Sequence, residues 1–509
     1  MQTFQTPVQA AQWLRASGVA NLRTDHRAIE EGDAFLAWPG AATDARVHVE
    51  SALAAGAAAC LVEQVGSELF QFNDPRVACV SRLKALCGPI ASTFLNDPSA
   101  KLDVLAVTGT NGKTSITWWL AQALSGLTAQ AAVPCAVVGT LGVGVPPHLV
   151  STGLTTPDPV ALHAAFDAFA ASGLRACAIE ASSIGIEEHR LDGARIHTAV
   201  FTNLTQDHLD YHGSMAAYWR AKQKLFSWPG LRAAVVNVDD SYGAELASHI
   251  TKRRGDFALD LWTVSMLPPV AKPARLQALN ICHQDDRVSL SVEEGDERAL
   301  LVTHLVGDYN IVNVLEVIAA MRTLGVPLAD AVTACSRLTP VPGRMECVSV
   351  PDQPLVAVDY AHTPDALAKA IDALRAVTQQ RGGKLWCVFG CGGSRDNTKR
   401  PLMGAIAARH ADRVVVTSDN PRREAPDAII SQILLGMVGA PGVTVESDRA
   451  QAIAQTVAQA QAQDVVLVAG KGHETYQEIA GQKFAFSDMA HVRAALEQRS
   501  ATYRRESQP

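Results

Sequence analysis

The feature that most constrains the fold is a short glycine-bearing loop, residues 108–114 (TGTNGKT), which lies between an apolar run and a helix pattern. Residues 103–108 (DVLAVT) predict a buried strand, and the helix pattern begins at Ser115. Small residues let backbone N–H groups approach phosphates, and the N-terminus of the helix adds positive potential. Lys113 can then contact the outer phosphates of a nucleotide, while the Thr114 hydroxyl can bind magnesium. The loop therefore favours an α/β fold that binds a nucleotide.

One position of this loop departs from the general phosphate-binding pattern, because Val107 stands where a glycine is usual. The segment can therefore also be interpreted as a tight strand–helix turn without a ligand. The lysine, the hydroxyl and the strand–helix context all agree with the first interpretation, so we favour nucleotide binding.

Further apolar runs alternate with helix patterns along most of the chain, which is typical of mostly parallel sheets covered by helices. Turn-rich segments at residues 96–99 and 339–343 mark two boundaries. We expect the α/β class with three domains: a small N-terminal α/β domain (1–98), a central phosphate-loop NTPase-like domain with a mostly parallel sheet (99–340), and a C-terminal Rossmann-like, doubly wound domain (341–509). Within the central domain, residues 255–300 predict an antiparallel excursion.

Length and composition agree with this division. A chain of 509 residues predicts about three domains at roughly 150 residues each. The content of 48% apolar and 19% charged residues excludes a disordered chain. A net charge of −7 provides no overall field for nucleic acid or an anionic membrane, so neither is an expected partner. We find no signal peptide, no membrane-spanning run and no paired cysteine spacing, and we expect a cytoplasmic protein with reduced thiols.

Polar residues gather where other predicted strands end. Glu180 ends the run 175–180 (RACAIE) and can either cap the next helix or bind a metal. His208 lies between two acids in residues 202–210 (TNLTQDHLD), although a lone histidine is more often structural. Asn310 and Asn313 stand one turn apart on a predicted helix, which suggests contact with a base.

Taken in order, these segments resemble the Mur ligases and the related folylpolyglutamate synthases, which use ATP to make amide bonds. The matching motifs are TGTNGKT, NxxxDHxD around His208, AKxxLF beginning at Ala221, NxxN at 310–313, GRME at 343–346 and DYAHxP at 359–364. The resemblance implies a catalytic group of Lys113, Glu180, His208 and Lys222, and magnesium bound by Thr114, Glu180, His208 and a carbamylated Lys222. It implies ATP contacts from Gly109, Thr110, Asn111, Gly112, Lys113, Thr114, Asn310, Asn313, Arg344, Asp359 and His362.

The N-terminal region resembles the uridine-nucleotide-binding domain of Mur enzymes that add the third residue of the peptidoglycan stem. The resemblance implies contacts with a UDP-muramoyl peptide from Thr24, His26, Thr155, Thr156, Ser182, Glu188 and Arg190. His26 replaces a usual serine, Ile184 a frequent histidine and Glu188 a frequent glutamine.

Residues 419–422 (DNPR) follow the run 413–418 (RVVVTS) and, taken alone, read as a proline-bearing turn with an exposed arginine. They resemble the meso-diaminopimelate signature of the family, and lysine-adding relatives usually lack this arginine. A guanidinium recognises the extra carboxylate of meso-diaminopimelate well. The implied acceptor contacts are Arg395, Asp419, Asn420, Pro421, Arg422, Gly470 and Glu474, with Arg422 on the distal carboxylate and Glu474 on the distal ammonium.

The expected activity is therefore ATP-dependent addition of meso-diaminopimelate to UDP-N-acetylmuramoyl-L-alanyl-D-glutamate through an acyl phosphate, by a monomer. Three alternatives stay open: a folylpolyglutamate synthase, a lysine-adding Mur ligase, and an ATP-binding regulator of wall synthesis without catalysis. The first would lack this N-terminal region and DNPR, and the last would have no need to keep Lys113, His208 and Lys222.

Overall fold

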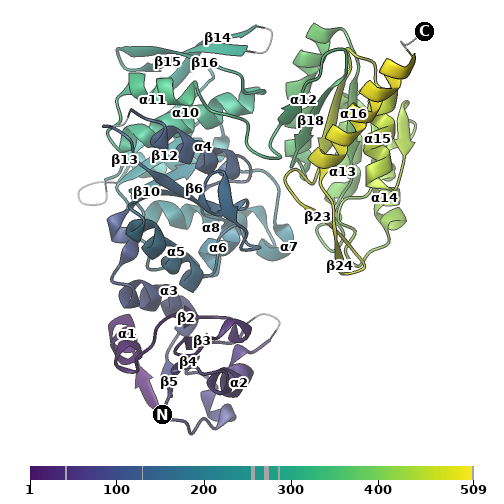
Figure 1. Ribbon diagram of the computed structural model, residues 1–509. Helices are drawn as coiled ribbons and strands as arrows, with labels where there is room; N and C mark the ends of the chain where they lie inside the picture. Colours follow the sequence, from purple (N-terminus) through teal and green to yellow (C-terminus); the bar gives the residue numbers. More distant parts are fainter. Residues whose placement is uncertain (41–42, 129, 254–257, 269–273, 285–286, 507–509) are drawn as a thin grey trace.

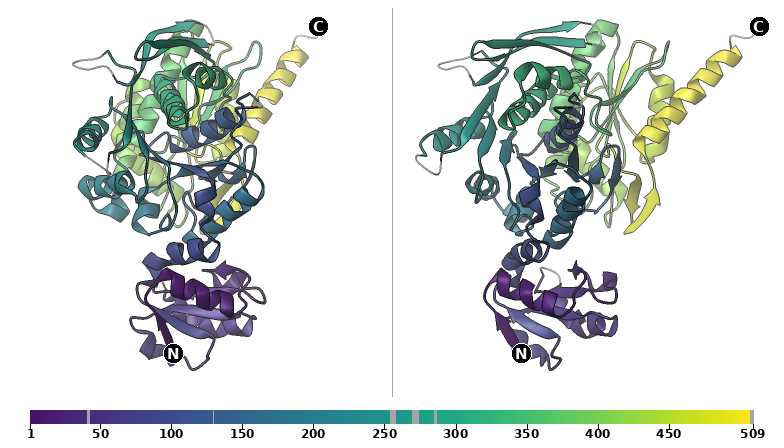
Figure 2. Two further views of the ribbon diagram at one scale, coloured as in Figure 1. Left: turned by 90° about the vertical axis from the view of Figure 1, so that its left-hand side faces the viewer. Right: turned by 60° about the vertical axis from the view of Figure 1, so that its left-hand side comes forward.

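The computed structural model describes residues 1–40, 43–128, 130–253, 258–268, 274–284 and 287–506, which fold into three α/β units in chain order. We call these the N-terminal unit (strands β1–β5), the central unit (β6–β16) and the third unit (β17–β24). The central and third units lie beside one another, and the N-terminal unit projects from one end of the central unit (Figures 1 and 2). The expected α/β class and three-domain layout are confirmed.

The N-terminal unit is a small parallel sheet with helices. Its elements are β1 (Gln2–Phe4), α1 (Pro7–Ala16), β2 (Leu22–Arg23), β3 (Ala34–Ala37), α2 (Val49–Ala54), β4 (Ala59–Glu63), β5 (Val77–Val80) and α3 (Leu83–Phe94). The strand order is β1-β5-β4-β3-β2, and every neighbouring pair is parallel. Helix α3 leads into the central unit and packs on α5 (Pro159–Ala171). A side chain at Gly88 would lie 2.0 Å from Asp192 O, so glycine permits this close approach.

The central unit is built on an 11-stranded sheet. Its other elements are β6 (Asp103–Thr108), α4 (Lys113–Ser125), β7 (Cys135–Gly139), β8 (Gly142–Val145), β9 (His148–Val150), β10 (Ala176–Glu180), α6 (Ser183–Glu187), β11 (Thr198–Phe201), α7 (Leu209–His212), α8 (Met215–Gln223), β12 (Ala233–Asn237), α9 (Ser241–Thr251), β13 (Asp260–Ser265), β14 (Leu276–Gln284), β15 (Arg287–Glu294), β16 (Glu297–Thr303), α10 (Asp308–Thr323) and α11 (Leu328–Cys335). The order is β16-β15-β14-β13-β12-β11-β6-β10-β7-β8-β9.

The stretch β14-β13-β12-β11-β6-β10-β7 of this order pairs in parallel, and antiparallel strands extend the sheet at both ends. The expected antiparallel excursion is confirmed for the pairs β14–β15 and β15–β16, whereas β14 pairs in parallel with β13. It begins later than expected, because β13 pairs in parallel with β12. Helix α9 returns the chain to the start of the sheet before β13, which gives both strands the same direction.

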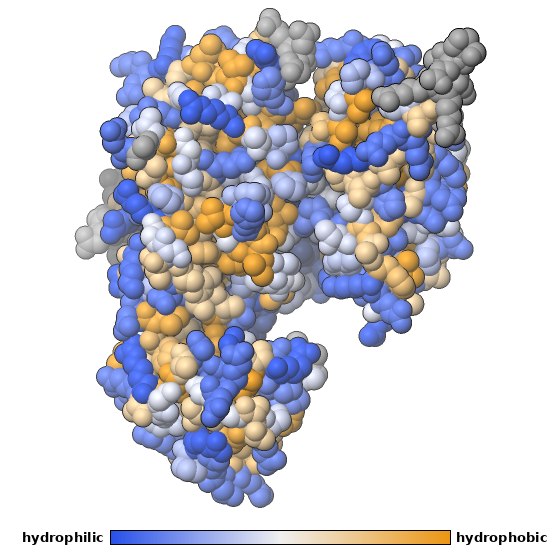
Figure 3. All heavy atoms as spheres, in the orientation of Figure 1, coloured by the Kyte–Doolittle hydropathy of each residue, from blue (hydrophilic) through white to orange (hydrophobic). Residues whose placement is uncertain are grey.

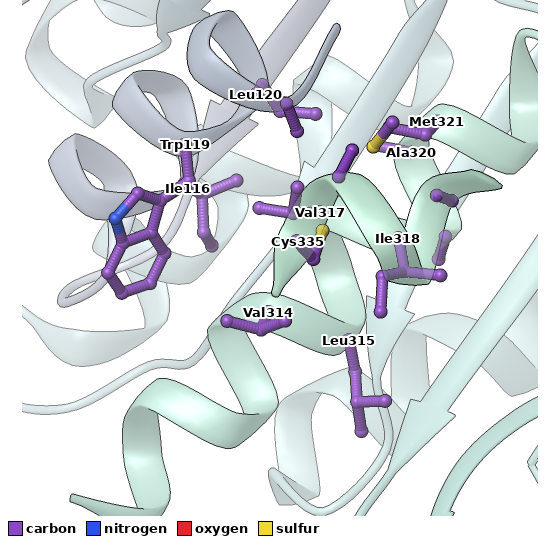
Figure 4. Close-up of a cluster of buried hydrophobic side chains, with 14 of the residues drawn as sticks. Ile116, Trp119, Leu120, Val314, Leu315, Val317, Ile318, Ala320, Met321 and Cys335 are labelled. Atoms are coloured by element: carbon purple, nitrogen blue, oxygen red, sulfur yellow. The ribbon is translucent and has the colours of Figure 1, made fainter. Parts of the chain in front are cut away.

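Helices cover both faces of the parallel strands. On one face α4, α10 and α11 pack through Ile116, Trp119, Val317 and Cys335, which are buried together (Figure 4). On the opposite face α5 and α8 enclose a second apolar cluster around Phe166. Burial on both faces explains why these strands are nearly continuous apolar runs. The packing fixes the carboxyl ends of the strands, where the polar segments begin.

The third unit is doubly wound, as expected. Its elements are β17 (Glu346–Val348), β18 (Leu355–Asp359), α12 (Pro364–Arg381), β19 (Leu385–Phe389), α13 (Lys399–His410), β20 (Arg413–Val416), α14 (Pro426–Leu434), β21 (Val443–Val445), α15 (Arg449–Gln459), β22 (Val465–Ala469), β23 (Tyr476–Ile479), β24 (Gln482–Ala485) and α16 (Asp488–Glu506). The order β17-β18-β22-β19-β20-β21 is parallel except for edge strand β17. In such sheets ligands bind beyond the carboxyl ends of the strands.

Across the described ranges, none of the helices has the length and apolar character that crossing a membrane requires. The ten cysteines are free thiols, of which Cys282 is exposed and Cys347 half-buried, and the others are buried. The surface is hollowed below the third unit, between it and the N-terminal unit (Figure 3).

Candidate active site

The loop between β6 and α4 has the geometry of a phosphate-binding loop. Gly109 and Gly112 adopt positive φ angles of 149° and 90°. A side chain at Gly109 would lie 1.8 Å from Thr202 Oγ1, and one at Gly112 would lie 2.6 Å from Asn313 Oδ1. Both positions require glycine. A larger residue would be strained at the positive φ angle, and its side chain would collide with Thr202 or Asn313.

The segment after β11 supports this loop. Asn111 N donates to Asn203 Oδ1 at 3.0 Å, and Thr202 Oγ1 donates to Asn111 O at 2.6 Å. The Thr110 hydroxyl accepts from Thr205 N at 2.9 Å. The residues that precede His208 in the chain therefore help to set the conformation of the phosphate loop.

Two lysines meet at one carbonyl of the loop. Lys113 Nζ donates to Gly109 O at 2.9 Å and to Thr110 O at 2.8 Å, and Lys222 Nζ donates to the same Gly109 O at 2.8 Å. Burial, together with the charge of Lys113, holds the pKa of Lys222 well below its ordinary value. Burial also lowers the pKa of Lys113, against the opposing effect of Glu180. Burial thus acts against the charged form of both amines.

Glu180, the last residue of β10, is 1% exposed. Its Oε1 accepts from Thr140 N at 2.8 Å, and its Oε2 accepts from Thr140 Oγ1 at 3.1 Å. The capping interpretation is wrong, because Ser182 caps α6 by accepting from Gly185 N. A buried carboxylate with lone pairs left over beside the phosphate loop has the chemistry of a cation ligand.

His208 directly precedes α7 and has a left-handed backbone conformation, with φ 53°. Its Nε2 lies 3.5 Å from Asp207 Oδ2. Burial and the nearby Lys113 and Lys222 lower the pKa of His208, although Asp207 opposes the shift. A neutral imidazole keeps a lone pair for a metal or a proton.

The structure places the four expected magnesium ligands around the phosphate loop. The Thr114 hydroxyl accepts from Arg344 Nη2 at 3.0 Å. The charge of Glu180 raises the pKa of Lys113 against the effect of burial, and the charges of the two lysines help to lower the pKa of His208. Among the described residues, no three His, Cys, Asp or Glu side chains lie close enough together to hold a metal. A magnesium site here would need the Thr114 hydroxyl and a modified Lys222 as well.

The expected base contacts lie at the start of α10. Asn310 Nδ2 donates to Val306 O at 2.7 Å, and Asn313 Nδ2 donates to Asn310 Oδ1 at 3.1 Å. Both side chains are buried, and Asn313 faces the phosphate loop at Gly112. The two asparagines therefore lie beside the phosphate loop and do not form a separate surface.

The third unit reaches this loop through Arg344, which lies 4.5 Å above the Tyr360 ring while it donates to Thr114. Asp359 ends β18, and its carboxylate accepts from Met345 N at 2.7 Å and from Ala361 N at 2.9 Å. Burial raises the pKa of Asp359. His362 follows, and burial with the charge of Lys399 lowers its pKa to about 4.

A second contact between these two units was missed by the sequence analysis. Asn111 Nδ2 donates to Asp365 Oδ2 at 3.0 Å, and Lys369 Nζ lies 3.0 Å from the same oxygen. Asp365 directly follows the DYAHTP motif, and this position next to a motif residue was the one feature of the sequence that could have predicted the contact.

The expected muramoyl-peptide residues of the central unit lie together next to Glu180. Thr156 Oγ1 donates to Glu180 O at 2.6 Å and lies 2.9 Å from Ser182 Oγ. Arg190 Nη1 donates to Thr156 O at 3.0 Å, and the Thr155 hydroxyl lies 3.1 Å from Thr140 Oγ1.

Other expected substrate residues have different surroundings. Glu188 Oε2 lies 2.5 Å from Lys84 Nζ of α3, and its Oε1 accepts from the Tyr211 hydroxyl at 2.5 Å. Thr24 and His26 lie in the N-terminal unit, where the His26 ring stacks on His48 with centroids 3.8 Å apart. Lys84, Tyr211 and His48 were not predicted, because nothing in their local spacing distinguishes them.

The expected acceptor residues follow β19, β20 and β22. Asn420 Nδ2 donates to Glu474 Oε2 at 2.7 Å, and its Oδ1 accepts from the buried Lys471 at 3.0 Å. A side chain at Gly470 would lie 2.5 Å from Asp419 Oδ2. The ends of β20 and β22 thus share one network, and Lys471, which lies within AGKGHE, is its unpredicted member.

Arg422 is not the freely exposed arginine of an ordinary turn. Its side chain is 23% exposed, Nη1 donates to Gly393 O at 2.8 Å, and Nε lies 3.6 Å from Glu478 Oε2. A side chain at Gly393 would lie 2.0 Å from the carbonyl of Pro421. Arg395 is exposed on the same side of the unit, in the loop that contains Gly393.

Comparison with known proteins agrees with this geometry. Residues 107–321 match the Mur ligase middle domain, and residues 343–472 match the Mur ligase, glutamate ligase domain. The chain is 60% identical over 502 residues to the UDP-N-acetylmuramoyl-L-alanyl-D-glutamate–2,6-diaminopimelate ligase of Acidovorax sp. (strain JS42), which covers 98% of this chain and 99% of that protein.

Solved structures are similar over almost the whole length. A UDP-N-acetylmuramoyl-L-alanyl-D-glutamate–2,6-diaminopimelate ligase has a TM-score of 0.66 and 33% identity, covering 95% of each chain. The MurF ligase of Thermotoga maritima in complex with ADP has a TM-score of 0.65 at 17% identity, covering 96% of this chain and 99% of that one, which shows a shared fold. The chain belongs to the Mur ligase family.

Proposed function

We propose that this protein uses ATP to join meso-2,6-diaminopimelate to UDP-N-acetylmuramoyl-L-alanyl-D-glutamate, a step of peptidoglycan precursor synthesis that releases ADP and phosphate. The observation that carries the proposal is that Arg422 follows β20 and Glu474 follows β22, so that both lie beyond the carboxyl ends of neighbouring parts of one sheet, with Glu474 already paired to Lys471 at 2.7 Å. Asn420 stands two residues before Arg422 and binds Glu474 directly. A ligand with one carboxylate and one ammonium at its distal end complements both charges. The 60% identity to a ligase of this name supports the same reaction.

Each domain has a main role in this proposal. Residues 1–98 bind the uridine nucleotide, residues 99–340 bind ATP and the muramoyl peptide, and residues 341–509 select the amino acid. The division is supported by the main sheet that each unit has of its own and by boundaries that fall between these sheets.

ATP lies along the phosphate loop, with its base towards α10 and its far side covered by the third unit. The proposed contacts are Gly109, Thr110, Asn111, Gly112, Lys113, Thr114, Asn310, Asn313, Arg344, Asp359 and His362. Support comes from the direct bonds between Arg344 and Thr114 and between Asn111 and Asp365, which bring the third unit to the loop. Binding at Thr114 would replace its bond to Arg344 and release that guanidinium for a phosphate.

Magnesium is the proposed metal, held by Thr114, Glu180, His208 and a carbamylated Lys222. Bound magnesium would neutralise phosphate charge during transfer. The buried amine of Lys222, with its lowered pKa, can add to carbon dioxide and lose a proton, which yields a carboxylate from a residue that is otherwise a competing cation. The product oxygen atoms suit magnesium, whereas an ammonium group does not.

The reaction has two steps. The glutamyl carboxylate attacks the γ-phosphate of ATP, the bond from the γ-phosphorus to the bridging oxygen breaks and ADP leaves, while Lys113 stabilises the negative charge of the transferring group. The free amine of the acceptor then attacks the acyl phosphate, and the tetrahedral intermediate expels phosphate. Thr155, Thr156, Ser182 and Arg190 hold the muramoyl peptide beside Glu180, and orientation by these groups lowers the entropic barrier.

The remaining substrate contacts act by charge and shape. Thr24 and His26 face the uridine nucleotide, and Glu188 borders the muramoyl peptide. Arg395, Asp419, Asn420, Pro421, Arg422, Gly470 and Glu474 surround the acceptor. Lysine lacks the distal carboxylate and would leave Arg422 without its ligand partner, which disfavours the binding of lysine.

The protein works as a cytoplasmic monomer in this proposal, with small molecules as its partners and with neither nucleic acid nor membrane. All of the proposed contacts come from one chain, so the site needs no second copy. The net charge of −7 leaves attraction of the anionic substrates to a few placed cations.

The test is a panel of acceptors in a phosphate-release assay with the dipeptide substrate and ATP. Wild-type protein should release phosphate with meso-diaminopimelate and not with lysine, and Lys222→Ala should abolish release. Arg422→Ala should weaken the response to meso-diaminopimelate. Release that depends on lysine would make the protein a lysine-adding ligase, and no amide product with any acceptor would favour a regulator without catalysis.

A further inference from the structure

An ion pair between a buried arginine and a partly exposed glutamate lies behind the acceptor loops of the third unit. Arg400, at the start of α13, has a side chain that is 1% exposed and forms two bonds to Glu424: Nη1 to Oε2 at 2.8 Å and Nη2 to Oε1 at 3.0 Å. The same guanidinium donates to Gln432 Oε1 at 2.8 Å and to Gly392 O at 3.1 Å. The Arg400 guanidinium lowers the pKa of Glu424 to about 2, so the carboxylate is ionised throughout the neutral range.

This pair joins the two loops that contain the expected acceptor arginines. Glu424 Oε1 also accepts from the backbone N–H of Ser394, the residue before Arg395. Glu424 itself stands two residues after Arg422, in the loop that follows β20. Glu424 therefore connects the two loops. Its carboxylate is hydrogen-bonded to the backbone next to Arg395, and Glu424 itself stands two residues from Arg422 in the chain.

The backbone between the two loops is close-packed. Gly393 N donates to Asn420 O at 2.9 Å, and a side chain at Gly392 would lie 2.9 Å from Arg422 Nη1. Ser394 and Arg422 have left-handed backbone conformations, with φ of 53° and 54°. Residues other than glycine hold such conformations only where their surroundings enforce them.

We propose that the Arg400–Glu424 pair sets the relative position of Arg395 and Arg422, and thereby determines how tightly and how selectively the acceptor binds. This inference rests on the proposed function, since it assumes that the two arginines receive the carboxylates of the acceptor. Arg400 and Glu424 touch no substrate and act as positioning residues. A planar guanidinium bonded in two places fixes both loops, whereas a lysine at position 400 would keep the charge and lose the second bond.

The first variant is Arg400→Lys, and the second is Glu424→Gln, which keeps the volume and removes the charge. The KM values for acceptor, dipeptide substrate and ATP are measured separately, together with the melting temperature. We expect the acceptor KM to rise at least about tenfold in both variants, because small displacements of orienting groups have large effects. The other two KM values should stay within about twofold of wild type. Discrimination between meso-diaminopimelate and lysine should fall.

The matched control is Arg375→Lys. Arg375 bonds to Asp412 at 2.6 Å in the same unit, but at the opposite, amino-terminal end of the sheet. This substitution should leave the acceptor KM unchanged. Because Arg400 acts through Arg395, adding Arg395→Ala to Arg400→Lys should raise the acceptor KM less than Arg395→Ala does in the wild-type protein.

Two results would overturn the inference: an unchanged acceptor KM in both variants, or a parallel change of all three KM values with a lower melting temperature. Failure of the proposed function is a separate outcome, visible in the wild-type protein. If wild type prefers a different amino acid, the acceptor assignment is wrong, and the pair is judged by the same three KM values with that amino acid.

Discussion

The phosphate loop and the acceptor site are held together in different ways. Lys113 bonds to carbonyls three and four residues away in its own loop, so residues of one short motif determine most of the conformation of the loop. Asn420 instead bonds to Glu474, 54 residues distant, and Arg422 bonds to Gly393, 29 residues distant. A contiguous motif is thus enough to identify the first site. The second site depends on how accurately three strand ends are brought together.

The largest expected effect comes from Lys113→Ala, because this side chain provides charge to the transferring phosphate from within the loop. We expect phosphate release to fall by about a thousandfold or more. Removal of the Lys113 charge should also raise the pKa of Lys222, since that charge helps to lower it. Lys101→Ala, at an exposed position before β6, is the control in the same assay. Activity near wild type in Lys113→Ala would contradict the proposed role of the loop.

Acid should destabilise the junction where the third unit meets the phosphate loop. His362 has a pKa of about 4 in the folded protein, against about 6.5 in an unfolded chain. The folded state therefore binds fewer protons between these values, and the free energy of unfolding falls as pH drops from about 6.5 to 4, by up to about 3 kcal/mol for this residue. Urea unfolding at several pH values measures how the free energy of unfolding depends on pH. His362→Gln should flatten the curve in this window, and an equal slope in both proteins would contradict the assignment.

Arg422→Lys should affect the acceptor site and leave the ATP site unchanged. Lysine keeps the charge and loses the fork that reaches both Gly393 and a distal carboxylate. We expect the acceptor KM to rise by about thirtyfold while the ATP KM stays unchanged. Initial rates with each substrate varied in turn provide the measurement, and a comparable rise in the ATP KM would mean that the two sites are not independent.

The smallest effect concerns Glu188, whose charge is opposed by Lys84 of α3. We expect Lys84→Gln alone to raise the KM of the dipeptide substrate by a few-fold, because it leaves a carboxylate facing an anionic ligand. The double variant Lys84→Gln, Glu188→Gln should return close to wild type, which corresponds to a coupling of about 1 kcal/mol. Additive effects would show that the pair does not border the substrate.

The sequence was sufficient for features that depend on local order. The strand–loop–helix around Lys113, the position of Glu180 at a strand end and the doubly wound third unit all follow from patterns within a few residues. Contacts made across long separations could not be predicted in this way. Asp365, Lys84 and Arg400 have ordinary local surroundings, and only the folded chain brings them to Asn111, Glu188 and Glu424. The parallel direction of β13 was missed for the same reason, because it depends on where α9 returns the chain.

The central claim is that one chain combines an ATP site with an acceptor site selective for meso-diaminopimelate. A single mixture tests it most directly: wild-type protein, ATP, magnesium, bicarbonate, UDP-N-acetylmuramoyl-L-alanyl-D-glutamate, and equal amounts of meso-diaminopimelate and lysine, with the products identified by mass spectrometry. The account predicts one nucleotide-linked tripeptide that contains diaminopimelate, formed in equal amount with ADP. A tripeptide that contains lysine, or ADP formed without any amide product, would contradict it.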